Sequence, residues 1–239
     1  MDNTNLNTDF SRRCVVDSNA LDWNASPSPL VHRRLLERDG GEVARATSIV
    51  RYGAGAIFES HLHELGEEIL VLEGTLSDEA GDYGAGTYLK NPPGSRHAPF
   101  SKDGCVLFVK LRHMNPEDAE RCVVDTRSSV WFQGLVAGLT VLPLAEFGTQ
   151  HTAMVRWAPG TFFSPHRHFG GEEIFVVEGV FSDEYGSYPE GCWIRSPHLS
   201  QHQPYSQEGC LILVKTGHLP VVNTPHGIVN SSMPGTSSH

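Results

Sequence analysis

The sequence predicts an all-β protein made of two tandem antiparallel barrels or sandwiches. The first observation is an internal repeat: residues 55–113 align with 160–218 at a constant offset of 105, without a gap, and 27 of the 59 aligned positions are identical. The second is the composition, because 24 Gly and 15 Pro in 239 residues are typical of a compact fold with many turns. The third is the even spacing of short β-rich segments between turn residues, with no long helical period.

Each half contains four segments of strand-forming residues that end at Gly, Pro or polar turn residues. In the first half these segments are residues 46–52, 68–72, 86–89 and 106–110, and in the second half they are 154–157, 173–177, 192–194 and 211–215. The repeat therefore divides the chain into two domains of about 100 residues, which is an ordinary domain size. We expect an N-terminal barrel at 1–118, a C-terminal barrel at 119–220 and a flexible tail at 221–239.

The most informative positions of the repeat carry three His and one Glu in each copy. Apolar positions vary between the copies, as Leu70 becomes Phe175, whereas these polar side chains do not. Both halves therefore need them for chemistry. They are His61, His63, Glu67 and His97 in the first half, and His166, His168, Glu172 and His202 in the second.

The spacing of these residues favours a metal site. Two His at positions i and i+2 of a strand point to the same face, so His61 and His63 can share one ion. Glu67 follows a turn that Gly66 permits, and a turn at Pro92 and Gly94 brings His97 from a neighbouring strand. Three imidazoles and one carboxylate suit a divalent transition metal with open coordination positions, and ligand types alone leave Zn, Fe, Mn and Ni as candidates. We expect two such ions per chain.

The two blocks resemble those of the cupin superfamily, and most closely the ChrR-like cupins. The segments that carry this resemblance are Glu73-Gly74-x2-Ser77-Asp78-Glu79 with Tyr83, and Glu178-Gly179-x2-Ser182-Asp183-Glu184 with Tyr188. The resemblance implies a bicupin: two double-stranded β-helix (jelly-roll) barrels, each binding a metal through the His, His, Glu, His set. In that group the cupin domain is the sensory half of a zinc-dependent anti-sigma factor. The anti-sigma module uses an N-terminal His-x3-Cys-x2-Cys zinc site, but residues 1–45 contain only Cys14 and His32, so that function is not carried over.

Two functions stay open. The first is a mononuclear non-haem metal enzyme, because similar cupins include dioxygenases that act on diketones and hydroxyaryl ketones. The catalytic residues are not assigned, but apolar residues are expected to wall a substrate pocket: Phe58, Ile69 and Phe108, with Phe163, Ile174 and Leu213. The alternative is a non-catalytic ChrR-like sensor or regulatory protein that binds a metal or small ligand. A small molecule is the expected partner in both, and a homodimer stays open.

Other repeated residues carry weaker expectations. Glu68 and Glu173 have the opposite parity to the ligand Glu and are expected to face outward or bind a loop. Tyr83 and Tyr188 are expected to cap a turn, and the Cys105 and Cys210 thiols to pack in the interior. Among positions that differ, Gly94 becomes Leu199 in the turn over the fourth ligand, so we expect the N-terminal site to be the more open one and the likelier site of catalysis.

Charge and cysteine usage exclude several classes of protein. The formal net charge is −10 and no basic run occurs, which argues against a nucleic-acid partner. No apolar window is long enough to cross a bilayer, so no membrane association is expected. The five cysteines form no Cys-x-x-Cys pair, and no secretory segment precedes them. We therefore expect free thiols and a cytoplasmic location.

Overall fold

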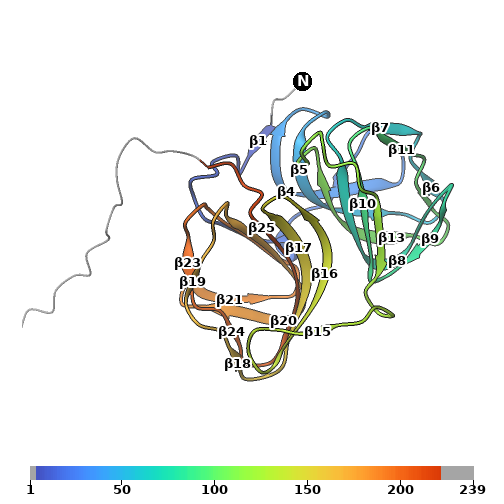
Figure 1. The fold of residues 1–239 in the computed structure, drawn as a ribbon. Coiled ribbons are helices and arrows are strands. Elements are labelled where there is room, and N and C mark those ends of the chain that lie inside the picture. Colours follow the sequence, from blue (N-terminus) through green and yellow to red (C-terminus); the bar gives the residue numbers. More distant parts are fainter. Residues whose placement is uncertain (1–3, 222–239) are drawn as a thin grey trace, which may run out of the picture.

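The chain folds into two β-barrels that lie side by side (Figure 1). This computed structural model describes residues 4–221, so the predicted tail lies outside the described residues from residue 222 onward. The first half contains a short 3-10 helix η1 (Ser18–Ala20) and these strands: β1 (Thr4–Leu6), β2 (Cys14–Asp17), β3 (Asn24–Ala25), β4 (Val31–Gly40), β5 (Arg45–Tyr52), β6 (Ala56–Ile57), β7 (His61–His63), β8 (Glu67–Asp78), β9 (Gly81–Gly84), β10 (Thr87–Asn91), β11 (Ser95–His97), β12 (Phe100–Ser101) and β13 (Cys105–Leu111).

The second half repeats the same succession. Its strands are β14 (Cys122–Asp125), β15 (Phe132–Gln133), β16 (Leu139–Phe147), β17 (Gln150–Trp157), β18 (Thr161–Phe162), β19 (His166–Arg167), β20 (Glu172–Asp183), β21 (Gly186–Pro189), β22 (Cys192–Ser196), β23 (Gln201–His202), β24 (Tyr205–Ser206) and β25 (Cys210–Thr216). Each of the eight predicted strand segments coincides with or overlaps one of these strands. The all-β prediction of two tandem barrels is therefore confirmed.

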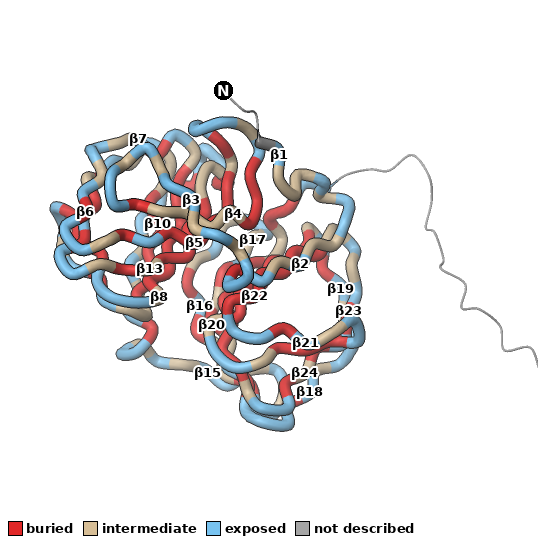
Figure 2. Tube along the Cα trace, turned by 180° about the vertical axis from the view of Figure 1, so that it is seen from behind, coloured by how far each residue is buried: buried red, intermediate tan, exposed pale blue. Residues whose placement is uncertain are grey.

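The two barrels exchange one strand each, β2 and β14. The main sheet of the N-terminal barrel runs β1-β4-β5-β13-β8-β10-β14, and that of the C-terminal barrel runs β15-β16-β17-β25-β20-β22-β2. Strand β2 thus lies beside β22 (Figure 2), with Cys14 opposite Arg195. Strand β14 pairs with β10, with Cys122 opposite Lys90. The segment before each repeat closes the sheet of the other repeat. The domain limits 1–118 and 119–220 remain a proposal. They follow the sequence repeat and do not take the exchanged strands into account.

Successive residues of the long strands alternate between two hydrophobic cores. In β8, Ile69 and Val71 face the interior of the N-terminal barrel, while Leu70 packs between the barrels. The Phe108 and Phe175 rings meet in this inter-barrel core with centroids 4.9 Å apart. The prediction that Phe108 and Leu213 wall a pocket is therefore wrong, since both belong to the inter-barrel core. The residues beside them in β13 and β25 line the cavities instead: Leu107, Val109, Ile212 and Val214.

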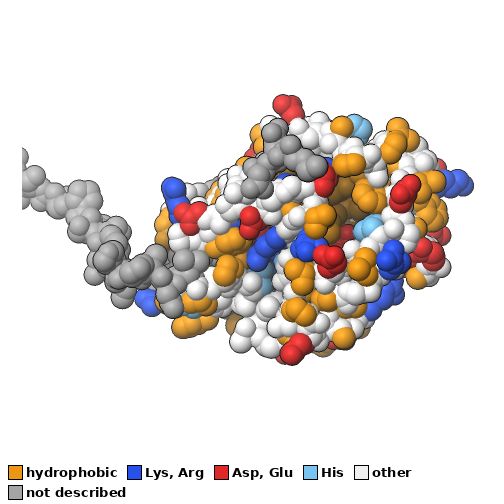
Figure 3. All heavy atoms as spheres, turned by 90° about the horizontal axis from the view of Figure 1, so that it is seen from above, with side chains coloured by type: hydrophobic (Ala, Val, Ile, Leu, Met, Phe, Trp, Pro, Cys, Tyr) orange, Lys and Arg blue, Asp and Glu red, His pale blue; other side chains and the backbone are white. Residues whose placement is uncertain are grey.

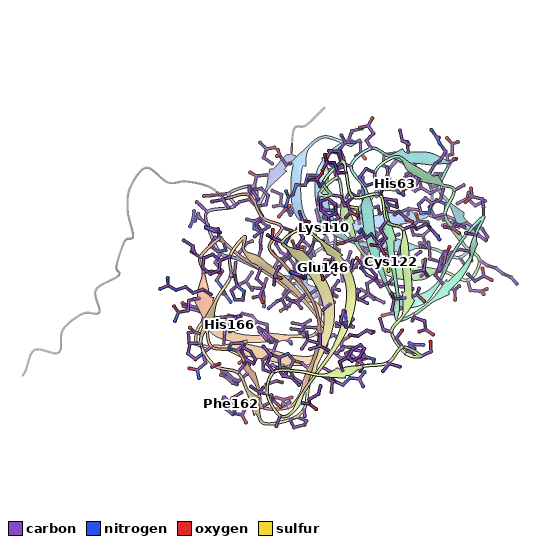
Figure 4. All side chains as sticks on the ribbon, in the orientation of Figure 1. His63, Lys110, Cys122, Glu146, Phe162 and His166 are labelled. Atoms are coloured by element: carbon purple, nitrogen blue, oxygen red, sulfur yellow. The ribbon has the colours of Figure 1, made fainter. Side chains whose placement is uncertain are left out.

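A buried polar network crosses the same interface. Lys110 Nζ lies 2.7 Å from Glu173 Oε2 of the other barrel, and Lys215 Nζ lies 2.8 Å from Glu68 Oε1, so two ion pairs cross in opposite directions. Figure 4 places Lys110 between the barrels that contain His63 and His166. The prediction that Glu68 and Glu173 face outward is wrong, because the outer face of each main sheet is covered by the other barrel.

The same two carboxylates contact the buried histidines that follow β13 and β25. His113 Nε2 lies 3.2 Å from Glu68 Oε2, and His218 Nε2 lies 3.0 Å from Glu173 Oε2. Burial lowers the pKa of His113 to about 4 and that of His218 to about 3, so both rings are neutral at neutral pH. Burial alone would raise the pKa of Glu68, but the Lys215 ammonium and His113 hold it well below its usual range.

Two further expectations concern membranes and thiols. Within residues 4–221, no helix has the length and apolar character needed to span a bilayer. All five cysteines are free thiols, and Cys105 and Cys210 are buried as expected.

Candidate metal centres

Short paired strands bring the four candidate ligands of the N-terminal barrel together. Strand β7 pairs with β11, which puts His97 directly opposite His61, and the alternation along β7 puts His63 on the same side as His61. Gly66 has a φ of 73° and turns the chain so that Glu67 begins β8 beside them. One ligand atom from each of the four residues lies within 4.8 Å of all the others.

The C-terminal barrel repeats this arrangement with its own four residues. Strand β19 pairs with β23, so His166 lies opposite His202, and Gly171 supplies the turn before Glu172 with a φ of 70°. The ligand atoms of the set again lie within 4.8 Å of one another: His166, His168, Glu172 and His202. The structure thus brings together both predicted sets.

The hydrogen bonding of these side chains fits a bound cation. The Nε2 atoms of four imidazoles are buried and have no hydrogen-bond partner among the described residues: His63, His97, His168 and His202. In each centre two of these nitrogens lie 3.5 Å from the same Oε2, that of Glu67 or of Glu172. Unpaired buried nitrogens that converge on a carboxylate are the donor set of a divalent transition ion. His61 Nδ1 faces the Glu59 carbonyl oxygen at 2.9 Å, which leaves Nε2 of that ring for the ion.

Burial keeps two of the candidate histidines, His63 and His168, in the neutral form that a metal needs. It lowers the pKa of His63, and it lowers that of His168 to about 3, with the neighbouring His202 and His166 as further causes. Burial also raises the pKa of Glu172 to about 7, so that carboxyl group is partly protonated at neutral pH when no cation is bound. Asn91 donates to Glu67 Oε2 at 3.0 Å, and the second barrel has Ser196 in its place.

An aspartate behind each centre contacts the fourth histidine. Asp78 Oδ2 lies 3.3 Å from His97 Nδ1, and Asp183 Oδ2 lies 3.4 Å from His202 Nδ1. The Tyr83 and Tyr188 hydroxyls each donate to the other oxygen of the aspartate, at 2.8 Å. The tyrosines expected to cap a turn therefore also fix the carboxylate that orients a candidate ligand.

Two arginines extend these histidine, aspartate and tyrosine contacts. Each arginine directly precedes one of the exchanged strands, β2 or β14. Arg13 donates to Asp183 Oδ2 at 2.9 Å and to the Tyr188 hydroxyl at 2.8 Å, while Arg121 donates to the Tyr83 hydroxyl at 3.1 Å. Our reading of the sequence did not find them. A signal was present, because the pentapeptide Arg-Cys-Val-Val-Asp occurs at 13–17 and again at 121–125. Its offset of 108 differs from the offset of 105 in the main repeat.

The N-terminal centre lies in the larger cavity. That cavity has a volume of about 380 Å³, whereas the C-terminal cavity has about 190 Å³. Apolar side chains wall both, and the expected Phe58, Ile69, Phe163 and Ile174 are among them. Figure 3 shows a hollow lined by hydrophobic side chains, with charged side chains beside it.

The expected cause of this difference is wrong. Leu199 is 48% exposed and lies outside the lining of the C-terminal cavity. Larger aromatic residues fill that cavity instead, since Trp157 replaces Tyr52 and Phe181 replaces Leu76. Aromatic volume inside the barrel therefore sets the size of the pocket.

Apart from the candidate ligands, charged residues occur in the lining of the N-terminal cavity and not in that of the C-terminal cavity. Arg33 binds Glu42 of the β4–β5 loop, and Arg112 Nη1 lies 2.6 Å from Glu64 Oε2. In the second barrel, Val141 pairs at the position of Arg33, and Gly217 and Phe169 replace Arg112 and Glu64. The two cavities therefore differ in the polarity of the entrance as well as in size.

Comparisons with known proteins agree with this architecture. A family model described as the ChrR cupin-like domain matches the chain twice, at residues 11–115 and 119–220. A search of curated protein sequences found no significant match. Among solved structures, a proposed dioxygenase from Nostoc punctiforme has a TM-score of 0.73 and 15% identity, over 90% of this chain and 86% of that one. Protein Ylba from E. coli has a TM-score of 0.69 and 16% identity, over 89% and 94%. An oxalate decarboxylase from Lactobacillus farciminis, in a formate complex, has a TM-score of 0.59 and 13% identity, over 87% and 86%. At these identities the likeness concerns the fold.

Proposed function

Because the chain belongs to the ChrR cupin-like domain family, which matches both of its halves, we propose that it is a mononuclear non-haem metal enzyme of dioxygenase type. The proposed substrate is a small oxygenated molecule such as a diketone or a hydroxyaryl ketone, and the proposed site of reaction is the N-terminal centre. One observation supports this proposal above the others: His61, His63, Glu67 and His97 line a cavity of about 380 Å³ whose other walls are mainly apolar.

The four side chains would hold a divalent ion, with Fe, Mn, Ni and Zn as the candidates. Such an ion supplies Lewis acidity toward a coordinated oxygen. The chain itself supplies the surroundings. Val50, Leu107 and Val109 keep water from the walls of the cavity, and Asp78 and Asn91 fix His97 and Glu67 from behind. An ionised substrate oxygen is favoured at such a site because the low-polarity walls strengthen its attraction to a cation.

Metal reconstitution combined with an oxygen-consumption screen tests the proposal. The protein is purified without a chelating tag, stripped of metal and reloaded anaerobically with Fe, Mn, Ni or Zn. It is then assayed with acetylacetone and with ortho-hydroxyacetophenone. We expect oxygen consumption that requires one of the metals and that is lost in His63→Ala. Oxygen consumption by the metal-free protein, or none with any metal and substrate, would overturn the enzymatic proposal.

A non-catalytic sensor of a metal or small ligand is the second candidate. It is favoured by the ion pairs that join the barrels, because Glu68 follows Glu67 directly and binds Lys215 of the other barrel. A change at one centre has a short path to the other barrel through this contact. The sensor would show no turnover, but hydrogen exchange of β25 would slow when the N-terminal centre alone is loaded. Unchanged exchange in β25 would argue against it.

A further inference from the structure

Besides the candidate metal ligands, each cavity is lined by one aromatic residue whose hydrogen-bond donor has no protein partner among residues 4–221. In the C-terminal cavity this donor is the indole of Trp157, which is 5% exposed and whose Nε1 has no acceptor. Trp157 lines this cavity together with three candidate metal ligands, His166, Glu172 and His202. A buried N–H without an acceptor is unfavourable and rare in folded proteins, so its position in a ligand-sized cavity points to an acceptor on a bound molecule.

Tyr52 is the corresponding residue of the N-terminal cavity. It is 7% exposed and lines the cavity with His63 and Glu67. The other buried tyrosines, Tyr83, Tyr88 and Tyr188, each donate to a carboxylate. The Tyr52 hydroxyl has no such partner in the described part of the chain. A phenol keeps its proton at neutral pH and is therefore a donor.

The two residues occupy the same place in their barrels. Tyr52 ends β5 opposite Cys105, and Trp157 ends β17 opposite Cys210. The repeat has therefore changed the side chain at this place from a phenol to an indole but has kept a hydrogen-bond donor on a residue that lines the cavity. An apolar residue would satisfy packing alone, as it does at the neighbouring positions Val50 and Val155.

We propose that Tyr52 and Trp157 are the specificity-determining donors of the two cavities, and that each binds an oxygen of the ligand. Resting on the proposed function, this inference narrows the ligand to a molecule with two oxygens on an apolar body. One oxygen reaches the metal centre and the other accepts the hydrogen bond from the phenol or the indole.

The chemistry of the two donors distinguishes the ligands of the two barrels. A phenol both donates and accepts, so the cavity of Tyr52 admits a second oxygen that is a carbonyl or a hydroxyl. An indole only donates, so the cavity of Trp157 requires a carbonyl or another oxygen without a proton. The first cavity, with a volume of about 380 Å³, has room for a larger ligand than the second, with about 190 Å³.

The test is a binding titration on protein with one loaded centre. The His168→Ala background keeps the N-terminal centre, and the His63→Ala background keeps the C-terminal one. Each protein is loaded with Co(II) and titrated anaerobically with acetylacetone while its visible spectrum is recorded. We expect Tyr52→Phe, which removes only the hydroxyl group, to raise the Kd about tenfold in the first background. Trp157→Phe should raise it by a similar factor in the second. Cobalt content should not change.

A matched control and the contrary results separate the alternatives. Tyr205→Phe removes a hydroxyl outside both cavities and should leave the Kd unchanged. If acetylacetone binds with the same Kd to Tyr52→Phe and to the parent, the inference about the donor is wrong while the proposed function stands. An equal loss of affinity in Tyr205→Phe would also overturn it. If neither acetylacetone nor ortho-hydroxyacetophenone alters the cobalt spectrum of the parent, the proposed function fails together with this inference.

Discussion

The guanidinium of Arg13 binds the carboxylate of Asp183, and the two residues are 170 positions apart in the sequence. Asp183 Oδ2 in turn lies 3.4 Å from Nδ1 of His202, a candidate ligand of the C-terminal centre. A residue that precedes the N-terminal barrel therefore supports the metal centre of the other barrel. The exchange of β2 and β14 makes this contact possible, because each strand carries its preceding arginine to the opposite barrel.

Replacement of Arg13 should weaken metal binding at the C-terminal centre alone. Loss of a residue that orients a ligand costs about 10–100-fold in metal affinity. Arg13 contacts Asp183 and not the ligand itself, so we expect Arg13→Ala to lower the metal affinity by about 3–10-fold. Competition with a chelator on the His63→Ala protein measures this affinity. Arg121→Ala is the matched control and should leave this affinity unchanged. A loss of equal size at both centres would instead indicate a general loss of stability.

Each barrel should bind one ion independently. His63→Ala should empty the N-terminal centre and His168→Ala the C-terminal one, because the two ligand sets share no residue. Elemental analysis of the reconstituted protein and of both variants measures this. One ion or fewer in the unmodified protein would mean that one copy has lost its metal, and loss of both ions from a single variant would mean that the centres depend on each other.

The ion pairs between the barrels should contribute strongly to stability. Lys110→Met leaves Glu173 buried without its cation, and such a change costs about 3–5 kcal/mol in the free energy of unfolding. Chemical denaturation measures the loss. Lys102→Met, at an exposed position, is the control and should have little effect. Adding Glu173→Gln to Lys110→Met should recover part of the loss, and a double variant that is less stable than Lys110→Met would contradict the role assigned to the pair.

The candidate ligands could be predicted from the sequence because the repeat preserves them and because strand geometry is local. His61 and His63 share a face through the two-residue period of a strand, whatever surrounds the barrel. The same reasoning failed for Glu68, whose opposite parity places it on the outer face of the sheet. That face is exposed to solvent in an isolated barrel, but here it is covered by the other barrel. Phe108, which was expected to wall a pocket, lies on this covered face as well. Whether this face is exposed or buried depends on how the two barrels pack against each other.

Arg13 and Tyr52 were missed for different reasons. Arg13 acts across the exchange of β2, and no local pattern indicates that a segment will pair with a strand 180 residues away. The repeated pentapeptide at 13–17 and 121–125 marked the segment but not its partner. Tyr52 differs from Trp157, so identity between the copies gave no signal. What they share is a donor on a cavity wall, and that becomes visible only when the cavity is described.

Metal binding at the C-terminal centre should depend on pH through Glu172. Burial raises the pKa of this carboxyl group to about 7, and an ion can bind only after its proton has left. Affinity should therefore be constant above this pH and fall by about tenfold per pH unit below it. Competition with protons for His168 should begin only near the pKa of about 3 for that ring. Isothermal titration of the His63→Ala protein between pH 5 and 8 checks this, and an affinity that does not change over this range would contradict the assignment of Glu172 as a ligand.

The two centres should differ in their share of catalysis. The N-terminal cavity is about twice as large and has two ion pairs at its entrance, whereas aromatic side chains fill much of the C-terminal cavity. Glu67→Gln keeps the shape of the side chain but removes its charge, and we expect it to lower kcat about 100-fold or more for a substrate of the screen, since such charged groups contribute several kcal/mol. Glu172→Gln is the matched change in the other barrel and should reduce kcat less than twofold. The metal content of both variants is measured alongside, so that loss of the ion is distinguished from loss of chemistry. A greater fall in Glu172→Gln would reverse the assignment and make the smaller cavity the reacting one.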